Sequence, residues 1–285
     1  MFFLIGFAVV IGSVLGGYLP HGSIAVLNQP LEVLIICGAA IGAFIIANPK
    51  TVLSKIGSHL GRVMKGPPHD QESYIELLTL LYTIFKTARS KGMLSLEAHI
   101  DAPDDSPLFQ NFPKFLKNHH AVEFLTDYLR LLTMGSEDPM EMEDLMDKEI
   151  ETHHEESHKI SGAVTAMGDG LPAFGIVAAV LGIIVTMGSI TEPPEVLGAL
   201  VGAALVGTFL GILLAYGIVL PIGSNLSSYA DAESKYFECI KASVLAHLKG
   251  AAPAVSVEYG RKVLFSDVRP NFIEIEAALD QAPSI

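Results

Sequence analysis

The sequence is poor in charge and in cysteine. Only 17% of its 285 residues are charged, whereas soluble proteins typically carry about 25%. Half of the residues are hydrophobic. The two cysteines, Cys37 and Cys239, lie in an apolar and a polar stretch, so no disulfide framework is predicted. The net charge of -13 argues against nucleic acid as a partner, because phosphate binding requires clustered Lys and Arg.

Basic residues are absent from the first 49 positions, since the first is Lys50. The apolar N-terminus therefore lacks the basic region of a secretory signal, and we expect a retained membrane helix. No P-loop, nucleophile elbow or dinucleotide fingerprint occurs, so no enzyme activity, catalytic residue or cofactor is predicted. His154, Glu155 and His158 stand at HExxH spacing, but they lie in and beside the acidic run, which is interpreted as a solvated helix, and no metal site is expected.

The sequence does contain apolar runs that predict four membrane spans. They cover residues 1–18, 31–47, 171–190 and 196–222. Eighteen helical residues span about 27 Å, close to the bilayer core of about 30 Å. We therefore predict an all-α integral membrane protein with four transmembrane helices in two hairpins and a large helical cytoplasmic insert. The expected segments are 1–48 (first hairpin), 49–168 (insert), 169–222 (second hairpin) and 223–285 (C-terminal helix and tail).

The basic residues predict the orientation of these spans. All 18 Lys and Arg lie within residues 50–159 and 235–269. The positive-inside rule places the insert, the tail and both termini in the cytoplasm, and loops 19–30 and 191–195 outside. In the insert, periodicity predicts helices over 71–91 and 112–132. The acidic run 137–156 is interpreted as a solvated helix face, and the tail is expected to contain a helix over 224–249.

Small residues form stripes along the predicted spans. The fourth run has Ala199, Ala203, Gly207, Gly211 and Ala215 at four-residue spacing. One face of the third run carries Pro172, Gly175, Ala179, Gly182, Thr186 and Ser189. Such stripes let helix backbones approach closely in lipid. Two interpretations remain open: a packing face within the chain, or a face that meets a foreign helix or an ion path.

Carboxylates are missing from the interior of the apolar runs. Between Gly170 and Pro221 the only acids are Glu192 and Glu195 in the outer turn, and Glu32 lies at the outer edge of the second run. A buried carboxylate is the usual carrier in a proton path. If the chain moves ions, a partner helix must supply the titrating group.

Five stretches occur in the order of a known family. They are Gln29–Val33 with Gly38–Gly42, Ala88–Glu97, Leu145–His154, Met167–Ile176, and Val257–Lys262 with Arg269–Pro270. Together they resemble the MotA family of bacterial flagellar stator subunits. The resemblance implies a multi-pass protein of the bacterial inner membrane, a pentamer around two MotB helices that bring the ion-binding Asp, and torque on the rotor protein FliG. An ExbB/TolQ-like energiser of envelope transport and a passive membrane scaffold are the alternatives.

The resemblance also implies roles for particular residues. Pro172 and Pro221 match the functional prolines of the family, and Thr208 and Tyr216 match pore-side positions. Ala179 and Thr186 lie on the small-residue face that would line the ion path. Sodium stators of the family resemble one another in a Thr at the position of Ala179, where proton stators have a small apolar residue. The resemblance therefore favours H⁺ over Na⁺ as the translocated ion.

The last pair implied by the resemblance is Arg89 and Glu97, which match the charged residues that face FliG. Gly92 lies between them and is expected to end the preceding helix. Arg89 and Glu97 should therefore lie around a turn, both exposed, at the base of the insert.

Overall fold

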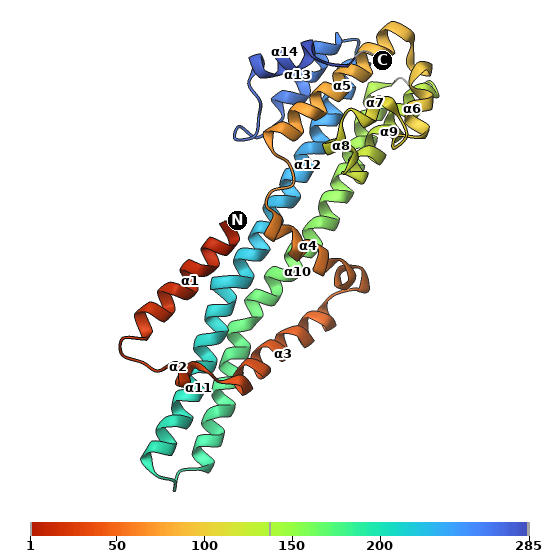
Figure 1. Cartoon of the computed structure of the whole chain (residues 1–285). Helices are drawn as coiled ribbons and strands as arrows, with labels where there is room; N and C mark the ends of the chain where they lie inside the picture. The colour runs from red at the N-terminus through yellow and green to blue at the C-terminus, as the bar shows by residue number, and fades with distance from the viewer. Residues whose placement is uncertain (1, 137, 284–285) are drawn as a thin grey trace. The chain divides into compact units, whose positions relative to one another are not determined.

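The computed structural model describes residues 2–136 and 138–283, and this part of the chain is helical without a strand (Figure 1). The α-helices are α1 (Phe2–Tyr18), α2 (Ile24–Leu27), α3 (Pro30–Ala47), α4 (Lys50–Lys65), α5 (Gln71–Lys91), α6 (Glu97–Asp101), α7 (Pro107–Gln110), α8 (Pro113–Leu116), α9 (His119–Thr133), α10 (Pro139–Gly188), α11 (Pro194–Leu214), α12 (Leu220–Leu248), α13 (Pro253–Lys262) and α14 (Phe272–Asp280). A 3₁₀ turn covers Met93–Leu96, and a π turn covers Ala215–Val219.

The chain divides into two units, each assembled from two segments. Unit 1 comprises residues 1–66 and 156–229, and unit 2 comprises residues 67–155 and 230–285. The first unit holds the apolar helices, and the second holds most of the charged residues. Each unit therefore draws on distant parts of the sequence.

Unit 1 has the composition of a membrane-embedded bundle. Among the described residues, three helical stretches are long and apolar enough to cross a bilayer: Ile24–Ala47, Pro139–Gly188 and Pro194–Leu248. The apolar α1 is shorter. Large hydrophobic side chains face outward, such as Ile46 at 89% exposure and Ile184 at 60%. Water would oppose this arrangement and lipid favours it.

Two predicted helix boundaries in the apolar region are wrong. α10 is one helix of 50 residues, so Pro172 lies in its interior and not in the first turn of a separate span. The fourth run and the tail helix are likewise continuous, from Pro194 through the π turn to Leu248. The acidic and apolar parts of α10 are joined without a break, because a helix satisfies its backbone hydrogen bonds in water and in lipid alike.

Unit 2 is built around α5, whose predicted span of 71–91 is confirmed. The Asp70 side chain accepts a hydrogen bond of 2.8 Å from the backbone N–H of Ser73 and caps the helix. Gly92, at φ 86°, ends it. Between these signals, Leu77, Leu81 and other apolar residues are fully buried in the core of the unit.

The helix predicted over 112–132 is two helices in the structure. α8 ends at Leu116, and α9 begins at His119. The Asn118 side chain accepts a hydrogen bond of 3.2 Å from the backbone N–H of Ala121. This N-cap starts a new helix where the apolar periodicity alone indicated continuity.

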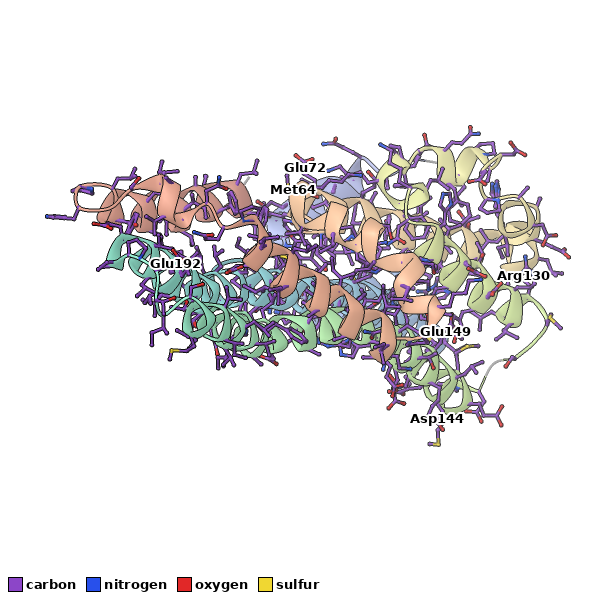
Figure 2. The ribbon with its side chains drawn as sticks, turned by 90° about the horizontal axis from the view of Figure 1, so that it is seen from below. Met64, Glu72, Arg130, Asp144, Glu149 and Glu192 are labelled. Atoms are coloured by element: carbon purple, nitrogen blue, oxygen red, sulfur yellow. The ribbon has the colours of Figure 1, made fainter. Side chains whose placement is uncertain are left out.

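The acidic run lies on α10, and the prediction of a solvated helix face is confirmed for residues 138–156; Glu137 lies outside the described residues. Met142, Met146 and Ile150 point into the core of unit 2. Asp144 and Glu149, labelled in Figure 2, are exposed. Part of the acidic face also pairs with α12, where Lys241 Nζ lies 2.5 Å from an Asp147 carboxylate oxygen.

Candidate functional site

The backbones of α10 and α11 touch at three glycines. A Cβ added to Gly175 would lie 3.0 Å from the Gly207 carbonyl oxygen, and one added to Gly211 would lie 2.8 Å from the Cα of Gly175. Figure 1 shows the two helices side by side along this stretch. Any side chain at these positions would push the helices apart, so only glycine permits the contact.

The contact continues through small residues toward the outer turn. A Cβ on Gly182 would lie 2.8 Å from the Cβ of Ala204, and Ala204 and Ala178 are fully buried. The packing interpretation of the stripe is therefore confirmed on α10. On α11 the residue buried in the contact is Ala204. Ala203, which the predicted stripe contained, is only half-buried. Steps of four residues advance about 40° beyond a helical turn each time, so the predicted stripe drifts off the contact face.

Three polar or small positions predicted for the ion path lie on or beside this contact. The backbone nitrogen of Ala179 would be 3.3 Å from a Cβ on Gly207, and the Cα of Thr208 would be 3.4 Å from one on Gly175. Thr186 is only 7% exposed, and its hydroxyl donates a 2.8 Å hydrogen bond to the Gly182 carbonyl oxygen. The structure thus gathers Ala179 and Thr208 near one level and places Thr186 two turns farther out.

The two prolines flank the same level of the helix pair. Pro172 follows Leu171, whose carbonyl oxygen lies close to Gly211 of α11: a Cβ added to Gly211 would be only 2.8 Å from it. On the opposite helix, Pro221 follows Leu220, whose backbone nitrogen would lie 3.3 Å from a Cβ on Gly168. Each proline lacks a backbone N–H and leaves a carbonyl one turn back without its usual donor. Pro172 therefore lies where α10 meets the end of α11, and Pro221 lies where α10 meets the start of α12.

A π turn precedes Pro221 and was missed by the sequence analysis. The Leu220 N–H donates to the Ala215 carbonyl, five residues back. A widened turn relieves the clash of a proline ring with the preceding turn, and such turns are frequent at functional sites. Tyr216 lies within it, 66% exposed in the single chain. The only sequence signal for the widened turn is Pro221 itself.

A groove of about 510 Å³ lies between α10 and α12 near the prolines, and several of its lining residues are polar. Its lining includes Ser161, Thr165, Asp169, Ser224 and Ser227. A Cβ on Gly223 would lie 3.2 Å from the Thr165 backbone nitrogen, so the helices also approach closely here. Hydroxyl and carboxylate groups of this kind hold water. The groove therefore places hydroxyl and carboxylate groups near the level of the prolines.

The predicted rotor-facing pair lies in unit 2. Arg89 is in the last turn of α5 and Glu97 begins α6; Gly92 and the 3₁₀ turn separate them, and both are exposed as predicted. Near Arg89, the His247 ring stacks on Phe85 with centroids 4.5 Å apart. Burial and the Arg89 charge lower the pKa of His247, so it adds no positive charge near neutral pH. Arg89 and Glu97 thus present one charge of each sign.

Another motif from the sequence analysis is structural. Arg261 is only 7% exposed, and its Nη1 donates a 2.9 Å hydrogen bond to the Pro270 carbonyl oxygen. Its Nη2 lies 2.6 Å from Glu258, and this hydrogen bond lowers the pKa of the Glu258 carboxyl. Arg269 donates to the Leu264 carbonyl oxygen. These contacts hold the chain between α13 and α14.

Comparisons with known proteins define the class. Residues 116–239 match the MotA/TolQ/ExbB proton channel family, and residues 4–92 match the family described as motility protein A N-terminal. The chain is 43% identical over 277 residues to motility protein A of Escherichia coli K12, covering 97% of this chain and 94% of that protein. The chain belongs to the motility protein A family. This full-length similarity favours a stator over the ExbB/TolQ-like alternative.

Solved structures agree with the fold. The flagellar MotAB stator complex from Bacillus subtilis matches with a TM-score of 0.73 and 27% identity, covering 90% of this chain and 92% of that one. The C. jejuni MotAB structure matches with a TM-score of 0.78 and 20% identity, covering 95% and 98%. The second likeness bears on the fold alone.

The glycine contact yields a stability prediction. Gly211→Val should destabilise unit 1 by about 1–3 kcal/mol, because the new side chain must displace the α10 backbone. Gly198→Val on the same helix is the control, since a Cβ there meets nothing within 4 Å. The measurement is the apparent melting temperature of each purified variant in detergent. Equal melting temperatures for the two variants would show that the contact is not tight.

Proposed function

We propose that this chain is a stator subunit of the bacterial flagellar motor, an inner-membrane protein that forms an ion channel with a MotB partner and converts ion-motive force into torque. The observation that carries the proposal is the tight packing of α10 on α11 along apolar stretches, residues 171–188 and 196–214, that contain no carboxylate, in a chain 43% identical to a motility protein A. Such a pair can support an ion path and needs a second protein for the titrating group.

The proposed topology has four spans in two hairpins. The first hairpin is α1 and α3, and the second is the apolar half of α10 with α11. The 17 residues of α1 reach about 26 Å, enough to cross with help from flanking residues. Both termini, the insert 49–168 and the tail 223–285 lie in the cytoplasm on this proposal, and 1–48 and 169–222 are membrane hairpins. The distribution of Lys and Arg supports this orientation.

The proposed assembly is a pentamer of this chain around two MotB helices, with FliG as the rotor partner. Similarity to proteins solved as MotAB complexes supports the partner. Tyr216, in the π turn before Pro221, is 66% exposed, so its side chain is available for contact with a partner helix. MotB would bring the Asp that takes up the ion.

The proposed ion path follows Ala179, Thr186 and Thr208 to the level of Pro172, Tyr216 and Pro221. A sodium ion requires several oxygen ligands to replace its water, whereas a proton can pass along ordered water to a carboxylate. Ala179 offers no side-chain oxygen, and the hydroxyls of Thr186 and Thr208 are few oxygen ligands for a sodium ion. These features support a proton path.

The ion assignment predicts how motility responds to sodium. Swimming speed of cells driven by this stator should be independent of external sodium at fixed pH and ionic strength. A protonophore should abolish swimming, because the driving force is the proton gradient. Speed that rises with sodium and survives the protonophore would contradict the assignment.

The proline geometry predicts a separation of assembly from torque. Pro172→Ala restores a backbone N–H inside α10 and should stiffen the helix where a partner's protonation must become movement. The variant should assemble with its partner at the normal level and produce no torque, measured by co-purification and by tethered-cell rotation. Val180→Ala, at an exposed position of the same helix, is the control. Normal rotation of the Pro172 variant would remove this role, and a passive scaffold would then fit as well.

The exposed pair at Arg89 and Glu97 predicts weak, reversible contact with the rotor. One charge crossing 100 mV yields about 2.3 kcal/mol, whereas an exposed ion pair is worth about 0.2–1 kcal/mol. Such pairs can therefore form and release within the work of one ion. Arg89→Glu should reduce motility, and reversing the matching rotor acid should restore part of it. If the double reversal swims no better than either single one, with both proteins present, the pairing idea fails.

A further inference from the structure

Helix α4 differs from the rest of the chain in its charge. Its 16 residues contain Lys50, Lys55, Arg62 and Lys65 and no acid, in a protein of net charge -13. It follows the apolar α3 after a two-residue break, where Asn48 and Pro49 have extended backbones. Figure 1 shows that the chain changes direction there. A basic helix thus begins directly at the end of a candidate membrane span.

The apolar side of α4 is wider than the surface that the protein covers. Val52 and Val63 are 7% and 4% exposed, and Val63 packs with Val164 in the core of unit 1. The apolar side continues beyond this contact, at about 100° per residue, to Leu60 and Met64. These side chains are 40% and 48% exposed. Part of the apolar face therefore lies outside the protein core.

Cations lie next to this uncovered apolar strip. On the helical wheel, Met64 is followed around the axis by Gly57, Lys50, Gly61, Ser54 and Lys65, within about 100°. The two glycines are small and meet nothing within 4 Å of an added Cβ. Apolar side chains bordered by lysines on a helix of low net hydrophobicity are the pattern of a helix in the plane of a membrane surface. Lysine stems can lie along the apolar surface while the ammonium groups reach phosphate.

We propose that α4 lies in the cytoplasmic interface of the membrane, with Leu60 and Met64 at the acyl boundary and Lys50 and Lys65 bound to headgroups of anionic phospholipids. The positive charge without any acid in the helix, beside a span that ends at the same place, identifies an anionic bilayer surface as the occupant. The proposal requires that α3 spans the membrane with Lys50 inside, and it does not depend on the motor role.

The first test measures lipid selectivity on the full chain in nanodiscs of phosphatidylethanolamine with graded phosphatidylglycerol. The protein is then released from the nanodisc, and native mass spectrometry counts the phosphatidylglycerol molecules that remain bound to it. The double variant Lys50→Gln, Lys65→Gln should bind phosphatidylglycerol with an affinity lower by about fivefold for each lost charge, or about 25-fold in total. Lys86→Gln with Lys117→Gln, the same charge change in unit 2, is the control and should leave the affinity unchanged. Equal retention by both double variants would overturn the proposal.

The second test measures depth and separates lipid from a second copy of the chain. An environment-sensitive fluorophore is attached to the cysteine of a Leu60→Cys variant, and a Leu94→Cys variant is the control, because Leu94 is 71% exposed in unit 2. Both variants also carry Cys37→Ser, so that the probe does not react at Cys37. The native Cys239 is fully buried and can stay. The probe at position 60 should be quenched by spin-labelled lipid and the probe at position 94 should not. A probe at position 60 that is shielded in detergent and unaffected by spin-labelled lipid would mean that another subunit covers this face. That result, or equal quenching at both positions, would contradict the proposal.

Discussion

The contact between the backbones of α10 and α11 is the constraint on which the membrane part of this protein depends. Lipid gives no hydrophobic drive for helices to associate, so helices in a bilayer need close van der Waals contact. Gly175, Gly207 and Gly211 provide it because they carry no side chain where the two backbones come closest. The same contact aligns Ala179 and Thr208 at one level and brings the proline of each helix to the end of the pair. The packing interpretation and the ion-path interpretation of the stripe are therefore compatible: one face of the small residues packs within the chain, and its edges remain for a partner.

The function follows from a division of labour between proteins. The described apolar segments pack against one another through small and hydroxyl-bearing residues. Their acidic residues Glu32, Glu192 and Glu195 lie at the ends of these segments. An uncompensated charge inside the bilayer is costly, so a group that takes up and releases a proton is best carried by a helix that moves. In this account the chain supplies a rigid wall with two irregular points, Pro172 and the π turn before Pro221, and the partner supplies the titrating group. On the same account, the groove between α10 and α12 would hold the water through which the ion leaves.

The sequence was sufficient where local signals agreed. The span Gln71–Lys91 was predicted correctly from its apolar period, and in the structure the Asp70 cap and Gly92 mark the same ends. The prediction failed where composition changes within one helix, since the acidic and apolar halves of α10 join without a break at Pro172. It also failed at Asn118, whose capping bond ends a periodic pattern, and at the π turn Ala215–Val219, which has no residue signature besides the nearby proline. The roles of single residues in the ion path came from family resemblance, because an ion path shared with another protein leaves little trace in the residues of one chain.

Ion flux through purified protein tests the central claim most directly, that this chain builds the path and a partner brings the titrating carboxylate. The chain would be reconstituted in liposomes alone, with its MotB partner, and with a partner whose membrane Asp is replaced by Asn, and proton uptake would be followed with an internal pH dye under an imposed potential. The account predicts flux only with the unaltered partner. Flux through the chain alone, or undiminished flux with the Asn partner, would contradict it.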